Sequence, residues 1–398
     1  MLRSHIDPTA ANTIHDEREL ARASWVLAAV YLLLFAYVGV FLPWFPPLLE
    51  ERGFSPRLIG IALALASASR ILLPPLWGVL ADRVEGRRHI LALASLLASG
   101  AMLALVPRWA VSVTLVWVFA HGFFLVPLFP LAETVTMNVL GRRRQAYGRI
   151  RLWGSVGFIV SSLGLGALIR RLGVEIVPIA AGAPLLLAGF VVLMLPGSAG
   201  ERRGRISRPE GSMPWRTLGL LVLTAALGQA SHGPYYAFFT LQMKARGVGP
   251  AVIGSLWALA VACEVVLMAC SPRLLARVGL LASLRWALLL SAVRWLVYAS
   301  EPTLFFIAMA QLLHAASFGL LHIASVQLVD HTTPDGAKAL GQSLLSSVAY
   351  GGGIGIGLFA AGMFIDRWGD AGLYLAASTL AAAGLLLSVS LPRTITSR

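Results

Sequence analysis

The chain has 398 residues, of which 58% are hydrophobic and only 13% are charged. Soluble domains carry about 25% charged residues, so this composition excludes an ordinary soluble enzyme, a disordered chain and a collagen-like fibre. The formal net charge of +14 comes from basic residues in short segments between apolar runs, not from one continuous basic face, which argues against nucleic-acid binding.

Apolar runs occupy most of the chain, and each approaches the length of about 20 residues that a helix needs to cross a bilayer. We therefore expect an all-α integral membrane protein with twelve transmembrane helices. The expected spans are 24–49, 58–80, 89–106, 109–138, 147–169, 175–195, 216–242, 250–270, 283–299, 303–329, 340–364 and 371–391.

One connection differs from the others. Residues 196–215 are rich in Gly, Pro, Ser and Arg, and they separate six spans from six. We expect an N-terminal six-helix bundle at 1–195, a cytoplasmic linker at 196–215 and a C-terminal six-helix bundle at 216–398. The sequences GALIRRLG (166–173) and GMFIDRWG (362–369) recur at a similar place in each half. Such a repeat predicts two pseudo-symmetric bundles that rock against each other.

Orientation follows from the distribution of Arg and Lys. If both termini lie inside, the inner segments hold 21 basic residues, the outer loops hold eight, and three lie within spans. This bias predicts cytoplasmic termini. We expect a multi-pass protein of the bacterial inner membrane.

Charged residues inside the spans are the strongest functional candidates, because each is costly in the bilayer unless it is paired or hydrated. The candidates are the arginines and glutamates within the spans, together with four histidines that also lie there. The full set is Arg70, Glu133, Arg151, Glu264, Arg294, His121, His232, His314 and His322.

Glu133 and Arg151 lie on adjacent antiparallel spans, so their side chains can meet at one depth. They are expected either to clamp a substrate through carboxylate and guanidinium hydrogen bonds, or to form a structural ion pair that closes the inner side. Arg70 has no acidic partner in its own half. A substrate carboxylate would supply the anion that this guanidinium lacks.

Glu264, Arg294 and His314 form a second candidate set, on three spans of the C-terminal half. A buried carboxyl beside a guanidinium and an imidazole could take up a proton on one side and release it on the other. The alternative is a static polar network that holds three helices together.

Motifs for other chemistries are missing from the sequence. It contains no HExxH, GxSxG, P-loop or CxxC pattern, and its two cysteines have no metal-site spacing, so we expect no enzyme, no metal and no cofactor. The run GGGIGIG (351–357) lacks the strand-then-helix context of a phosphate loop and predicts close helix packing instead.

With these residues in view, the chain resembles the major facilitator superfamily over essentially its whole length. Gly78, Asp82 and Arg83 in GVLADRV resemble the loop after the second span, which implies a gating role for them. The segments PWFPPLL (43–49), PLAET (130–134) and GRIRLWGSVGF (148–158) resemble the branch that contains lactose permease and the phenylpropionate permease.

Departures from lactose permease point toward the phenylpropionate group. Phe158 replaces the Trp that stacks on galactose, Ser317 replaces the carboxylate that carries the coupled proton, and SHGPYYAFF (231–239) offers His232 where lactose permease has acids. The resemblance implies substrate binding by Arg70, Glu133, Arg151, Phe158 and His232, and proton coupling by Glu264, Arg294 and His314.

We therefore expect a proton-coupled symporter of a small organic solute, with an aromatic carboxylate such as 3-phenylpropionate first, that works by alternating access as a monomer. The expected partners are that solute, protons and the lipid bilayer. A neutral sugar or a nucleoside is the alternative cargo. Drug efflux and a receptor that binds without translocation are weaker alternatives.

Overall fold

The computed structural model describes residues 8–72, 86–141, 143–196 and 212–392, and within these ranges the chain forms helices and no strand. The helices follow the expected spans in chain order. They are α1 (Pro8–Glu51), α2 (Pro56–Leu72), α4 (Arg87–Leu103), α5 (Val111–Leu125), α6 (Leu128–Leu140), η1 (Arg144–Ala146), α7 (Tyr147–Leu172), η2 (Val174–Ile176), α8 (Val177–Val192), α9 (Trp215–Ala230), α10 (Gly233–Ala245), α11 (Pro250–Val278), α12 (Leu280–Ala299), α13 (Leu304–Leu312), η3 (Ala315–Leu320), α14 (Leu321–Thr332), α15 (Lys338–Leu344), η4 (Leu345–Gly353) and α16 (Ile354–Val389).

Eight helical stretches of the described chain are long and apolar enough to cross a membrane. The last, Lys338–Val389, holds two expected spans, because the backbone turns at Gly369 with φ of 62°, a conformation that glycine adopts without strain. The remaining expected spans correspond to α2 and α4, with 17 described residues each, and to the pair α9 and α10. The twelve-helix expectation is thus confirmed.

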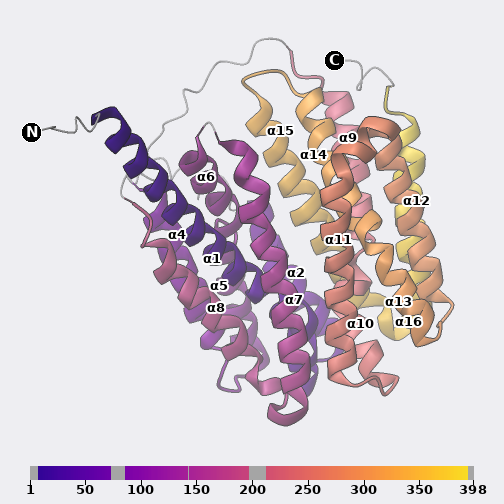
Figure 1. Ribbon diagram of the computed structural model, residues 1–398. Coiled ribbons are helices and arrows are strands. Elements are labelled where there is room, and N and C mark those ends of the chain that lie inside the picture. The colour runs from indigo at the N-terminus through magenta and orange to yellow at the C-terminus, as the bar shows by residue number, and fades with distance from the viewer. Residues whose placement is uncertain (1–7, 73–85, 142, 197–211, 393–398) are drawn as a thin grey trace, which may run out of the picture.

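The helices form two groups (Figure 1). Those that precede the linker lie on one side of the molecule, and those that follow it lie on the other, while α1 begins and α16 ends at the same end. Within the N-terminal half, α1 packs against α7 and α8, and α4 packs against α5 and α8. Within the C-terminal half, α16 packs against α9, α10 and α12. The expected linker lies almost wholly outside the described residues, so its boundaries stay a prediction.

The glycine run at 351–357 packs closely, as expected. A Cβ on Gly353 would lie 2.6 Å from the carbonyl oxygen of Ala226, and one on Gly357 would lie 2.2 Å from that of Ala230. Only a residue without a side chain lets η4 and α16 approach α9 this closely.

Glycines bring the two halves into contact at the end of the molecule opposite the start of α1. A Cβ on Gly254 of α11 would lie 2.5 Å from the carbonyl oxygen of Ser162 on α7, and a Cβ on Gly60 of α2 would lie 2.6 Å from the Cα of Gly362 on α16. The Ser162 hydroxyl also donates to the Gly254 carbonyl at 3.1 Å. Backbone is therefore in direct contact with backbone across the two halves.

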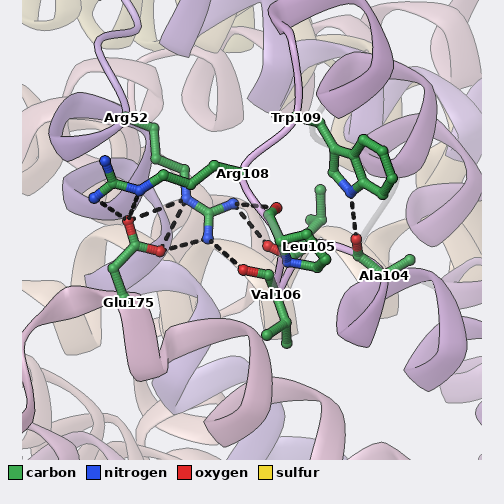
Figure 2. A network of polar contacts seen from close by, with 8 residues as sticks. Arg52, Ala104, Leu105, Val106, Arg108, Trp109 and Glu175 are labelled. Atoms are coloured by element: carbon green, nitrogen blue, oxygen red, sulfur yellow. Dashed lines mark hydrogen bonds and ion pairs between the residues drawn. The ribbon is translucent and has the colours of Figure 1, made fainter.

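A polar network ties the loops together at this same end of the N-terminal half (Figure 2). The Arg52 guanidinium donates to the Glu175 carboxylate at 2.5 Å and to the carbonyl of Leu105 at 2.7 Å. Arg108 binds the second Glu175 oxygen at 3.0 Å. The network joins the end of α1 to the segment after α4 and to η2.

Candidate functional site

A cavity of about 420 Å³ lies between the two halves, within the size range of small-molecule sites. Its described wall comes from α1, α2, α5, α6 and α7 on one side, and from α10, α11, η3, α14, η4 and α16 on the other. Aromatic side chains supply much of the surface, including the predicted Phe158, which is 4% exposed. The cavity therefore suits a cargo with a flat apolar part.

Two guanidinium groups line the cavity from the N-terminal half. Arg70 of α2 makes no hydrogen bond or ion pair with any described residue. Arg151 of α7 lies with its Cζ 3.9 Å from the ring centroid of Phe35 and likewise has no hydrogen-bonding or ionic partner in the described chain. Each guanidinium carries five donors that only an acceptor can satisfy. Both are therefore available to an anion that enters the cavity.

Glu264 is the one acidic side chain among the described residues of the cavity wall. It lies on α11, against Gly319 of η3, where an added Cβ would be 3.0 Å from its Cγ. Its carboxyl forms no hydrogen bond or ion pair with the described residues, and Arg151 is the cation that acts on it electrostatically. The wall thus carries two cations and one carboxyl.

Arg294 of α12 has the opposite surroundings. It is 0% exposed and donates to Gln311 Oε1 at 3.0 Å, to Ser317 Oγ at 3.1 Å and to the Ala310 carbonyl at 3.1 Å. Its Cζ lies 4.5 Å from the ring centroid of Tyr235. Every acceptor here is neutral, so the buried charge is stabilised without a carboxylate.

His314 joins this buried cation to the cavity. Its Nδ1 lies 3.1 Å from an Arg294 Nη1, and because a guanidinium can only donate, His314 Nδ1 must be unprotonated and accept. The same imidazole lines the cavity. The structure therefore brings the predicted pair Arg294 and His314 together and fixes the tautomer of the histidine.

A column of flat rings continues from His314 along the cavity wall. Phe318 stacks on His314 with ring centroids 5.4 Å apart, and His322 stacks on Phe318 at 6.4 Å. The Nδ1 of His322 is 2.6 Å from the hydroxyl of Tyr350 on η4. Phe318 and Tyr350 were not among the predicted residues. The signal for Phe318 was its spacing of four residues from both His314 and His322, which places the three on one helix face. That spacing gives no signal for Tyr350, which lies on η4.

The N-terminal half contains a second tyrosine–histidine pair at the cavity. The Tyr37 hydroxyl lies 2.7 Å from His121 Nε2, and His121 Nδ1 lies 2.9 Å from the Ala98 carbonyl. A carbonyl only accepts, so Nδ1 carries the proton and Nε2 accepts from Tyr37. His121 is therefore held as a neutral imidazole.

Two predicted binding residues are not part of the cavity wall among the described residues. Glu133 is exposed and accepts from the Tyr147 hydroxyl at 3.4 Å, and no ion pair joins it to Arg151 in the described chain. His232 is 0% exposed, with its Nδ1 2.9 Å from the Gly228 carbonyl and its ring edge-on to Trp295. Their assignment to substrate binding stays a prediction. The predicted gating residues Gly78, Asp82 and Arg83 lie outside the described residues.

Comparison with known proteins gives a consistent family assignment. The model of the MFS_1 like family matches residues 24–376. The chain is 28% identical over 364 residues to a "Probable 3-phenylpropionic acid transporter" of Escherichia coli (strain K12), and the aligned region covers 88% of this chain and 93% of that protein. It is also 28% identical over 379 residues to "Maltose permease" of Geobacillus stearothermophilus, with coverage of 92% and 94%.

A solved structure has the same fold. The crystal structure of a variant of nucleoside transporter NupG superposes with a TM-score of 0.81 at 14% sequence identity, over 93% of this chain and 99% of that chain. At this identity the likeness concerns the fold alone.

Proposed function

Because the chain belongs to the MFS_1 like family, we propose that it is a proton-coupled symporter of a small aromatic carboxylate, with 3-phenylpropionate as the first candidate. The observation that carries this proposal is the pair of guanidiniums, Arg70 and Arg151, which line an aromatic cavity without hydrogen-bonding or ionic partners in the described chain. A carboxylate on the cargo would satisfy them through charge-assisted hydrogen bonds. The transporter of Escherichia coli (strain K12) that is 28% identical supports this cargo class.

The proposed binding mode places the cargo's carboxylate at Arg70 and Arg151 and its ring among the aromatic side chains, including Phe158. Glu264 would take up the coupled proton, with Arg294 and His314 behind it as a fixed polar network. A neutral sugar is the second candidate. It is supported by the 28% identical maltose permease and by the hydroxyl and imidazole groups of Tyr350 and His322 at the cavity.

The proposed topology has both termini and the linker in the cytoplasm of a bacterial cell, with the protein in its inner membrane as a monomer. The excess of basic residues in those segments supports this orientation. The glycine contacts at Gly60 and Gly254 would then close the outer side, and the cavity would face inward. Rocking of the two halves about the cavity would open the outer side and provide alternating access.

The experiment is uptake of labelled 3-phenylpropionate into proteoliposomes that contain the purified protein, with a pH gradient, acid outside. Protein-free liposomes and liposomes with an Arg70→Gln variant measure passive entry of the neutral acid. We expect initial uptake well above both controls, and competition by unlabelled aromatic acids but not by maltose or a nucleoside. Uptake of maltose or a nucleoside instead, with none of the acid, would overturn the proposed cargo.

A further inference from the structure

Four helices that bring the two halves together share a reference level, which permits an inference about cargo orientation that rests on the proposed function. Gly60 of α2 meets Gly362 of α16, and Gly254 of α11 meets Ser162 of α7, at the same end of the molecule. Each residue of an α-helix advances about 1.5 Å along its axis. The number of residues from these contacts therefore gives the depth of a cavity residue below the closed end.

The charged side chains that these helices contribute to the cavity wall lie at one depth. Arg70 and Glu264 are each ten residues from the contact on their helix, and Arg151 is eleven residues from the contact on α7. These counts correspond to about 15–17 Å. On the fourth helix, Gly351 is eleven residues from the contact, and a Cβ on it would lie 3.2 Å from the Cβ of Arg70. This contact shows independently that counts on two different helices reach the same level.

One helical turn from the contacts, the same four helices present apolar side chains to the cavity. These four residues form an apolar ceiling at the closed end: Leu63, Phe158, Trp257 and Leu358. The indole Nε1 of Trp257 donates to Thr240 Oγ1 at 3.0 Å, so its one donor is already used. Tyr236 of α10 stacks on Trp257 with ring centroids 6.4 Å apart and extends the aromatic surface. The ceiling therefore suits a ring or an alkyl group.

Between these two levels the four helices contribute uncharged side chains. They lie seven or eight residues from the contacts and are Ser67, Ser155, Val261 and Ile354. The charged level and the apolar ceiling are thus separated by about two helical turns, or about 10 Å. A cargo carboxylate at the ceiling would be buried among apolar groups at a high cost, whereas at the charged level it meets guanidinium donors. A ring gains most from burial at the ceiling.

We propose that the cargo lies along the helix axes, with its carboxylate at Arg70 and Arg151 and its ring against the apolar ceiling. The ceiling then selects the cargo by the number of methylenes that separate the carboxylate from the ring. An acid that is too short leaves the ceiling uncovered. An acid that is too long either overpacks the ceiling or draws its carboxylate away from the guanidiniums. The ceiling residues are therefore specificity-determining residues, although they contribute nothing to anion binding.

The test measures the Kd of an unbranched series of acids with the purified full chain by isothermal titration calorimetry. The series is phenylacetate, 3-phenylpropionate, 4-phenylbutyrate and 5-phenylvalerate. Each buried methylene contributes about 0.8 kcal/mol, so the affinity should rise about fourfold per methylene until the ring reaches the ceiling, and then fall. An affinity that rises through the whole series, or that is independent of chain length, would overturn the inference.

Two substitutions move the ceiling in opposite directions. Leu63→Ala removes side-chain volume at the closed end, so the best-bound acid should become at least one methylene longer. Leu63→Phe adds volume there, so the best-bound acid should become shorter. Leu358→Ala, on the other half, should repeat the effect of Leu63→Ala and replaces it if that variant does not fold. An unchanged optimum in both alanine variants would contradict the proposed orientation.

Two further variants separate this effect from its alternatives. Leu185→Ala of α8 is the matched control, because Leu185 is 0% exposed and is not part of the described cavity wall, so the variant should keep the wild-type optimum. The same shift in Leu185→Ala would mean that general loosening, not the ceiling, sets the preference. Arg70→Gln should raise every Kd by a similar factor without a change of optimum. Failure of the wild-type protein to bind any acid of the series would instead overturn the proposed function.

Discussion

Arg294 in the C-terminal half and Arg70 in the N-terminal half are both arginines within membrane-spanning helices, but their surroundings differ. Arg294 is 0% exposed and donates to Gln311, Ser317 and the Ala310 carbonyl while its guanidinium lies over Tyr235. Arg70 lines the cavity and has no hydrogen-bonding or ionic partner in the described chain. Arg151 resembles Arg70 in this respect, apart from its contact with the Phe35 ring.

The difference separates two uses of the same side chain. A guanidinium whose donors are all satisfied by protein acceptors stabilises the helices that supply those acceptors. A guanidinium whose donors face a cavity contributes nothing comparable to folding, because its charge is left for water or a ligand. Replacement of Arg294 in the C-terminal half should therefore reduce stability, whereas replacement of Arg70 in the N-terminal half should reduce cargo binding.

The largest effect is expected for Arg294→Met. Its removal leaves Ser317 Oγ and His314 Nδ1 without the guanidinium donor, while Gln311 Oε1 still accepts from the Tyr235 hydroxyl at 3.2 Å. Each unsatisfied buried group costs about 1–3 kcal/mol. We expect the free energy of unfolding in detergent to fall by about 3 kcal/mol or more. Thermal unfolding of the purified variant measures this. Arg70→Met is the matched control and should unfold near the wild-type temperature; equal losses in both variants would contradict the comparison.

The next effect is on binding. Arg70→Gln and Arg151→Gln each remove charge-assisted hydrogen bonds of about 1.5–3 kcal/mol, so the Kd of 3-phenylpropionate should rise about 10-fold to 150-fold. Isothermal titration calorimetry on the purified variants measures the Kd. Arg70→Lys keeps the charge and should lose less affinity than Arg70→Gln. An Arg70→Gln variant that binds the acid as well as wild type would place Arg70 with Arg294, as a structural cation.

The sequence predicted the fold because the bilayer imposes a strong pattern on it. Each span must be apolar for about 20 residues, and the polar linker at 196–215 divides the pattern evenly. The helix starts were less predictable: α1 begins at Pro8, well before the expected start at 24, because polar residues extend a helix beyond the membrane at no cost.

The charged wall was also predictable, since charged residues are rare inside spans and have a reason to be there. Arg70, Arg151 and Glu264 were found in this way. The Tyr37–His121 and His322–Tyr350 pairs join residues 84 and 28 positions apart, which only the packing of helices reveals.

The same limit explains the residues that the structure places elsewhere. Glu133 and His232 have suitable chemistry, but they do not belong to the described cavity wall. The direction in which a side chain faces depends on the rotation of its helix about its own axis relative to its neighbours. A span that is apolar on nearly every face carries little information about that rotation.

The contact between the halves extends the comparison from cations to backbone. Gly254→Leu would place side-chain atoms where the Ser162 carbonyl already lies, and such overpacking costs about 1–3 kcal/mol unless the halves separate. We expect the variant to favour the state that is open at this end. A Leu42→Cys reporter in the cavity, with Cys263 and Cys270 replaced by Ser, would then react faster with an impermeant maleimide added from that side.

Gly164→Leu is the control for this reporter, because a Cβ at Gly164 meets nothing within 4 Å. It should leave the labelling rate unchanged. Equal rates in Gly254→Leu and the reporter parent would mean that the two halves do not separate at the glycine contact.

The smallest effect is expected for Lys244→Gln, which removes the ion pair between Lys244 and Glu50 across the two halves. The two atoms lie 2.7 Å apart, but both side chains are about half exposed, at 51% and 44%. Exposed ion pairs contribute about 1 kcal/mol or less, and salt screens them. The labelling rate of the same cysteine reporter should therefore rise less than in Gly254→Leu, and high salt should remove the difference from wild type. A larger rise in Lys244→Gln than in Gly254→Leu would mean that charge, rather than close backbone packing, holds this end closed. A cation paired within the protein, such as Lys244, would then control the opening of the cavity and not only the stability of the fold.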